Sequence, residues 1–85
     1  MKANICATFD DFEAADKGAI YYFDDGAANK CPGCGKECFL AERHDNNHPS
    51  WEIDRATNTL SPSVNHNVEG CGWHGWLRNG EWVLA

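Results

Sequence analysis

The chain is 85 residues long, carries a formal net charge of −6 at pH 7 and contains five cysteines. A chain of this length forms one domain, residues 1–85, whose hydrophobic core alone gives only marginal stability. The acidic balance argues against direct nucleic-acid binding, which depends on cationic contacts to phosphate. No apolar run approaches the ~20 residues that a membrane-spanning helix needs.

The first thirty residues predict a helix followed by a strand. Asp10-Asp11-Phe12-Glu13 has an acidic cap residue and a glutamate three positions later, so we expect a helix over residues 10–17 that stops at a glycine. Ala19–Phe23 is apolar and aromatic, which favours a strand, and Asp24-Asp25-Gly26 ends it. Burial in a sheet is favoured for these aromatic rings over an aromatic–acidic contact surface. Residues 1–30 form an N-terminal extension in this interpretation.

The rest of the sequence contains two four-residue motifs that begin and end with a possible metal ligand, called brackets here: Cys31-Pro-Gly-Cys34 and Cys71-Gly-Trp-His74. Each places two metal ligands three positions apart and is followed by glycine, a pattern typical of a chain that turns around a tetrahedral ion. Three thiolates and one imidazole form a closed set that favours structural zinc. We therefore predict one Zn²⁺ bound by Cys31, Cys34, Cys71 and His74, within a zinc-knuckle β core over residues 31–85.

Two further residues lie close enough in the sequence to replace a predicted ligand. Cys38 follows Cys34 by four positions, and His66 precedes Cys71 by five. Core packing as a small apolar side chain is the favoured interpretation of Cys38. For His66, a hydrogen bond to backbone or water is favoured over a functional role.

Between the brackets, the sequence predicts a small antiparallel sheet. Cys38–Glu42 is an expected strand, and residues 43–49 have the composition of a loop. Ser50–Asp54 alternates apolar and polar residues, as half-buried strands do. Leu60–Val64 is expected to be extended, with Pro62 keeping it at an edge or outside the sheet.

The C-terminal segment predicts a β-hairpin. Asn79-Gly80 lies between His74–Arg78 and Glu81–Leu84, and Asn-Gly is the strongest short hairpin signal because both central residues need positive φ. The first strand begins at the last predicted ligand, so the second bracket and the hairpin should form one unit. The predicted fold class is small α+β and mostly antiparallel β: a zinc-ribbon-like domain with a short N-terminal helix.

From Cys31 onward the chain resembles an uncharacterised family of small phage and bacterial zinc-binding proteins, some of which carry the label ammonia monooxygenase. The resemblance covers residues 31–84, leaves residues 1–30 outside, and implies a phage or prophage setting and a small metal-bound β domain. Nothing in the residues supports monooxygenase chemistry. The pieces that carry the resemblance are the Cys31–Gly35 bracket, His48-Pro49-Ser50-Trp51, Leu60–Val64, Cys71–His74 and Trp76–Gly80.

The sequence shows no nucleophile–base signature, phosphate-binding loop or paired carboxylates. We therefore predict a non-catalytic, zinc-stabilised protein-binding module, phage-encoded and acting on a host or phage protein, with a basic surface as the complement of an acidic chain. Metal-bound cysteines and the lack of a signal peptide favour the cytoplasm. Two alternatives stay open: a zinc-dependent hydrolase that uses His44, His48 or His66 beside an open metal position, and a virion or assembly component.

Overall fold

The computed structural model describes residues 1–43, 50–66 and 71–85 of the chain. His44, His48 and most of the predicted loop over residues 43–49 lie outside these ranges. The described residues form one helix and eight strands, in the order β1 (Asn4–Ile5), α1 (Phe9–Ala14), β2 (Ala19–Phe23), β3 (Gly26–Lys30), β4 (Glu37–Ala41), β5 (Glu52–Asp54), β6 (Thr59–Asn65), β7 (His74–Arg78) and β8 (Glu81–Leu84).

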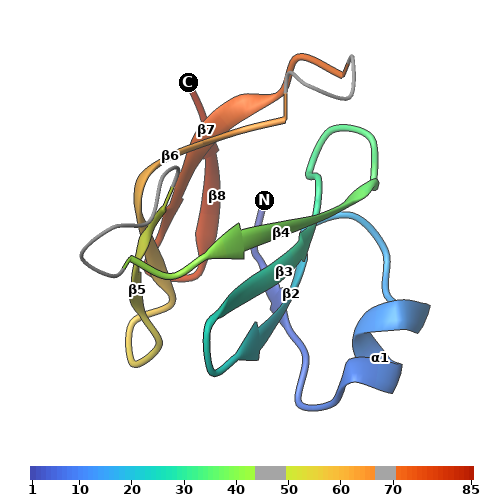
Figure 1. Cartoon of the computed structure of the whole chain (residues 1–85). Coiled ribbons are helices and arrows are strands. Elements are labelled where there is room, and N and C mark those ends of the chain that lie inside the picture. Colours follow the sequence, from blue (N-terminus) through green and yellow to red (C-terminus); the bar gives the residue numbers. More distant parts are fainter. Residues whose placement is uncertain (44–49, 67–70) are drawn as a thin grey trace.

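The strands form two four-stranded sheets, ordered β1-β2-β3-β4 and β5-β6-β7-β8 (Figure 1). The short β1 runs parallel to β2, and every other pair within the described strands is antiparallel. The prediction of a small, mostly antiparallel β domain with one short helix is therefore confirmed. In the described ranges, no helix is long and apolar enough to cross a membrane.

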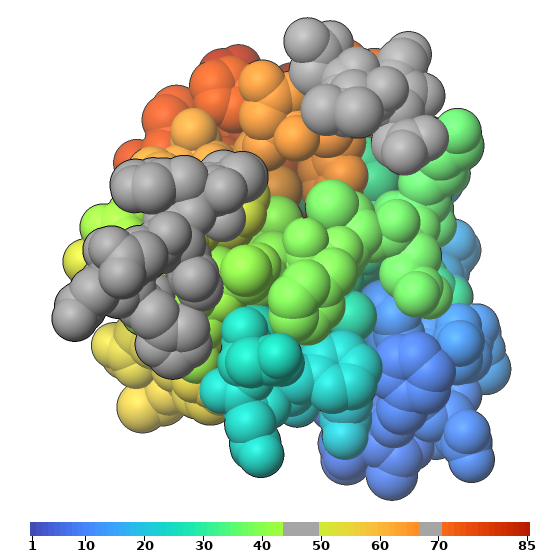
Figure 2. All heavy atoms as spheres, viewed as in Figure 1, coloured from blue at the N-terminus to red at the C-terminus, as the bar shows by residue number. Residues whose placement is uncertain are grey.

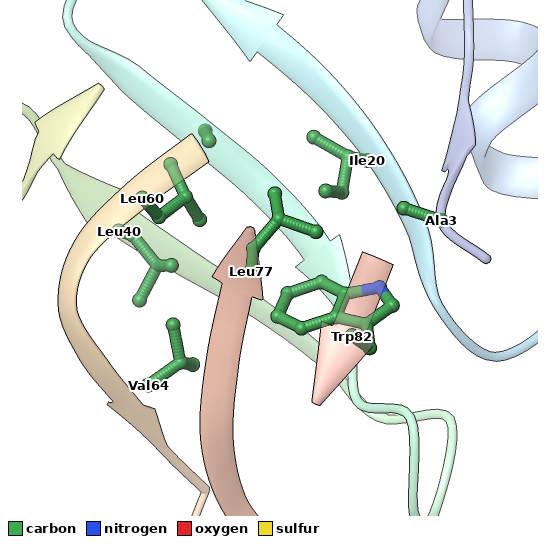
Figure 3. Packing of buried hydrophobic residues seen from close by; sticks show 8 residues of the cluster. Ala3, Ile20, Leu40, Leu60, Val64, Leu77 and Trp82 are labelled. Carbon is green, nitrogen blue, oxygen red and sulfur yellow. The ribbon is translucent and has the colours of Figure 1, made fainter. Parts of the chain in front are cut away.

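The main hydrophobic core lies between the two sheets (Figure 3). Both sheets contribute alternate residues of their strands to this core, because successive side chains of a strand point to opposite faces of the sheet. The indole Nε1 of Trp82 donates a 2.9 Å hydrogen bond to the carbonyl of Gly18, which links the second sheet to the first. The buried members of this core are Ala3, Ile20, Ala27, Leu40, Leu60, Val64, Leu77 and Trp82.

The helix α1 is shorter than the predicted 10–17 span and begins earlier. Thr8 is its cap residue, since its hydroxyl accepts a 3.1 Å hydrogen bond from the Asp11 backbone N–H. The helix ends at Ala14 because Ala15 is already extended, with φ −82° and ψ 163°. Its one buried residue, Phe12, packs in a second apolar cluster with Cys6, Ala19 and Ala28.

The predicted strand Ala19–Phe23 and the C-terminal hairpin are confirmed. Asn79 and Gly80 have φ values of 50° and 76°, as the Asn-Gly turn requires. The strand β3 was not predicted, because Gly-Ala-Ala-Asn-Lys carries almost none of the β-branched or aromatic residues that indicate strands. Its pairing to β2 and β4 is imposed by the tertiary structure.

The prediction that Pro62 keeps its segment at an edge or outside the sheet is wrong. β6 lies inside the second sheet, between β5 and β7. The register against β7 shifts between Leu60 and Val64, so this stretch departs from regular pairing. Proline is tolerated at such irregularities because it has no N–H to contribute to the ladder.

Leu77 provides a test of the inter-sheet core. Its side chain has no exposed surface, so Leu77→Ala should lower the free energy of unfolding by about 2–5 kcal/mol, measured by urea denaturation. Leu84→Ala, the same substitution at a position that is 67% exposed in the neighbouring strand, should change it by about 0.5 kcal/mol or less. Equal losses in the two variants would contradict a core located between the sheets.

Candidate functional site

Three cysteines form a compact group where the β3–β4 connection meets the segment before β7. The thiol sulfurs of Cys31, Cys34 and Cys71 all lie within 4.8 Å of one another, and the Sγ atoms of Cys31 and Cys71 are 3.3 Å apart. Thiolates that each lie ~2.3 Å from one tetrahedral ion are separated by about 3.8 Å. The structure thus brings together three of the four predicted ligands, in an arrangement that could hold a metal ion.

The connection from β3 to β4 is shaped around Cys31. The backbone N–H groups of Gly33 and Cys34 point at the Cys31 sulfur, at 3.3 and 3.5 Å. A Cβ atom added at Gly33 would lie only 3.1 Å from the Cys71 sulfur, so glycine permits the second sheet's cysteine to approach. Burial raises the pKa of the Cys31 thiol, whereas the backbone N–H of Lys36 is the main cause that lowers the pKa of Cys34.

His74, the fourth predicted ligand, is not part of this group. It is the first residue of β7, in which Gly75 and Leu77 are buried and the alternate residues face outward. Its ring therefore lies on the outer face of the second sheet, where His74 Nε2 is 2.9 Å from Ser63 Oγ. The alternation of the strand separates His74 from the thiols that its sequence spacing suggested.

The register between β6 and β7 places Ser63 close to His74. Beyond the register shift, Val64 pairs with Gly75 and Asn65 with His74, which leaves Ser63 diagonally across from the histidine. The indole Nε1 of Trp51 donates a 3.2 Å hydrogen bond to the Ser63 carbonyl.

A serine hydroxyl hydrogen-bonded to an imidazole has the geometry of a nucleophile–base pair. When the imidazole is neutral and carries its proton on Nδ1, Nε2 of His74 accepts the Ser63 proton. This pair was not predicted, because Leu-Ser-Pro-Ser-Val has no local nucleophile signature. The available signal was the alternation around Val64 and Leu77, which places Ser63 and His74 outward, but the register that joins them is a tertiary feature.

The two substitute ligands do not join the cysteine group. Cys38 is half-buried on β4 and packs against the main core. His66 is only 3% exposed, its ring lies edge-on to Trp73 at 6.1 Å, and burial lowers its pKa. Its Nε2 is buried without a hydrogen-bond partner among the described residues.

The predicted aromatic strand forms part of a shallow pocket on the first sheet. Figure 2 shows α1 in blue, the β2–β3 turn in cyan and β4 in green meeting on this face. Phe9, Phe23 and Phe39 remain 37%, 37% and 49% exposed, so these rings are not fully buried in the sheet. The lining residues are Phe9, Phe23, Ala28, Glu37, Cys38 and Phe39.

Residues 7–85 match a family model described as "Bacterial ubiquitination-like system serine protease (BubE)". Neither the comparison with curated proteins nor that with solved structures found a match. The matched segment begins at residue 7, so it includes most of the N-terminal part that the resemblance to phage and bacterial proteins left outside. The chain belongs to the BubE family.

This membership corrects two predictions. The family is named as a serine protease, so the prediction of a non-catalytic binding module is wrong, and so is the prediction that the chain is not an enzyme. The two alternatives, a zinc-dependent hydrolase and a virion component, also differ from what the family name describes.

Proposed function

We propose that Ser63 and His74 are the nucleophile and the general base of a serine protease, starting from the chain's membership of the BubE family. The 2.9 Å contact between Ser63 Oγ and His74 Nε2 carries this proposal. The distance is within the range in which a base takes the proton of its nucleophile. The family name further suggests the substrate class, an amide bond made or processed in a ubiquitination-like system.

The reaction follows the usual two steps of acyl transfer. The Ser63 oxygen attacks the carbonyl carbon of the scissile amide while its proton passes to His74 Nε2. The C–N bond breaks, the amine leaves with that proton, and the acyl group stays on Ser63 as an ester. Water then gives a proton to His74 and attacks the ester carbonyl, and the released Ser63 oxygen takes the proton back.

We further propose that the three thiolates bind one structural zinc ion. This proposal keeps the predicted classification of the fold as a zinc-ribbon-like domain. Cys31 and Cys34 belong to the β3–β4 connection of the first sheet, whereas Cys71 precedes β7 of the second. An ion at this point therefore ties the two sheets together. Zinc in sites of this kind contributes an apparent ~10–16 kcal/mol near neutral pH, more than a core of this size supplies.

The proposed partner rests on charge, whereas the proposed cytoplasmic location rests on the metal-binding cysteines. A formal net charge of −6 supports a partner with a basic surface, and this partner, like a cytoplasmic location, stays a prediction.

Ser63 and His74 form the proposed catalytic dyad, and substitution of either residue tests the proposed protease activity. Ser63→Ala should abolish labelling by a fluorophosphonate probe, read by intact-protein mass, because the probe bonds to the activated serine oxygen. His74→Gln should slow labelling by about 10²–10⁴-fold, the usual contribution of a general base. Both variants should keep the circular dichroism spectrum of the unsubstituted protein.

Ser61→Ala is the matched control for the nucleophile. Ser61 lies two residues away in the same strand and is exposed, so its loss should leave the labelling rate within about twofold, since surface substitutions outside the site have small effects. Labelling that persists in Ser63→Ala, or that disappears equally in Ser61→Ala, would contradict the assignment.

Metal analysis tests the zinc proposal. Protein purified under reducing conditions should contain one zinc ion per chain by inductively coupled plasma mass spectrometry. Cys71→Ser should lose the metal and its cooperative thermal unfolding, because the inter-sheet tie is removed. Cys38→Ser, which alters a cysteine outside the group, should retain both.

His74→Ala separates the two roles that this histidine has been given. The dyad assignment expects full zinc content together with lost labelling. Zinc loss as complete as in Cys71→Ser would make His74 the fourth ligand, as its spacing suggested, and would remove the general base from the proposed mechanism.

A further inference from the structure

A row of side chains continues from the dyad along the outer face of β7. The rings of His74 and Trp76 have centroids 6.0 Å apart and are inclined by 35°. The guanidinium carbon of Arg78 lies 4.7 Å from the centre of the Trp76 ring. Because alternate residues of a strand share a face, Ser63, His74, Trp76 and Arg78 form one continuous surface.

Arg78 holds its charge over this surface instead of in an ion pair. Its cross-strand neighbour is Glu81, but the Glu81 carboxylate lies 3.9 Å from the N-terminal amine of Met1. In the ranges that the structure describes, no carboxylate is within ion-pair distance of Arg78. Arg43 and Arg55, by contrast, are paired with acidic side chains at 3.3 and 2.9 Å.

This arrangement leaves guanidinium donors available beside a nucleophile in a chain with 13 acidic residues. The planar guanidinium matches a carboxylate with two parallel hydrogen bonds. Stacking on Trp76 holds the plane of the Arg78 side chain and reduces the entropy lost when a ligand binds. An extended peptide advances ~3.4 Å per residue, so a side chain two residues from the scissile bond lies about 7 Å along the row.

We infer that Trp76 and Arg78 form a substrate subsite that binds a carboxylate carried two or three residues from the scissile amide. The inference rests on the proposed protease function and specifies its substrate: an extended peptide segment with an acidic side chain or a free C-terminal carboxylate near the cleaved bond. Trp76 supplies the surface on which the peptide backbone lies, and Arg78 supplies the charge. Arg78 is a specificity residue that does not touch the reacting atoms.

Binding to the inactive Ser63→Ala protein tests the subsite without requiring turnover. The probes are Gly/Ala hexapeptides with a fluorescent label and one aspartate at each position in turn, plus an amidated and a free C-terminal form of the uncharged peptide. One or two aspartate positions, or the free C-terminus, should bind at least tenfold more tightly than the amidated uncharged peptide, the gain typical of a charged hydrogen-bonded contact.

Arg78→Gln in the Ser63→Ala background should remove this preference while leaving the binding of the uncharged peptide unchanged. Arg78→Lys should restore only part of it, because an ammonium group cannot form the bidentate contact. Arg55→Gln, which removes an arginine already paired with Glu42, is the matched control and should keep the preference. In active protein, Arg78→Gln should raise KM for the preferred peptide and spare kcat.

Equal affinity for all peptides, or a preference that survives Arg78→Gln, would overturn the subsite. The peptide-binding experiment and the test of the proposed function can fail independently. The proposed function is tested by fluorophosphonate labelling of the unsubstituted protein. If the probe does not label Ser63 in the unsubstituted protein but the carboxylate preference is present, the carboxylate-binding site is supported and its role in proteolysis is overturned. Reduced labelling in Arg78→Gln would show that the residue supports the dyad's structure instead of binding substrate.

Discussion

Burial of one face of β7 against the first sheet is the constraint from which the candidate site follows. Leu77 has no exposed surface in the inter-sheet core, and a side chain at Gly75 would collide with the carbonyl of Val83. Since successive residues of a strand face opposite sides, burying these two positions turns His74, Trp76 and Arg78 outward. The hydrophobic core and the proposed catalytic surface are therefore two faces of the same five-residue strand.

The cysteine group lies just before the start of β7. Cys71 lies three residues before His74 and meets Cys31 and Cys34 of the other sheet. An ion bound there would hold the entry to β7 without taking part in the chemistry on its outer face. If the cysteines bind zinc and His74 is the general base, as proposed, stability and catalysis are coupled through this short segment, and a variant that loses the metal would also lose the position of the base. Activity alone cannot separate the two roles.

Local sequence patterns predicted those features that depend on local physics. The Asn79-Gly80 turn needs positive φ at both residues, and the bracket around Cys31 needs closely spaced ligands, so both were visible before the structure. The Cys-x-x-His spacing is compatible with two fates for His74, ligation of a metal or the start of an outward-facing strand. In the structure, the pairing of β6 with β7 places His74 beside Ser63, and this pairing is a property of the folded sheet that local patterns do not encode.

The open position of the dyad constrains the kind of substrate it can serve. Coulomb interactions are weak in contact with bulk water and strengthen when water is excluded, and His74 lies on an exposed face of the sheet. A small ester substrate would leave His74 in contact with bulk water. A protein that lays an extended segment along β7 would instead cover the histidine, desolvate the developing oxyanion and bring its own charge to Arg78. If Ser63 and His74 act as proposed, this exposed geometry would favour macromolecular amide substrates, because the substrate itself would complete the enclosure of the site.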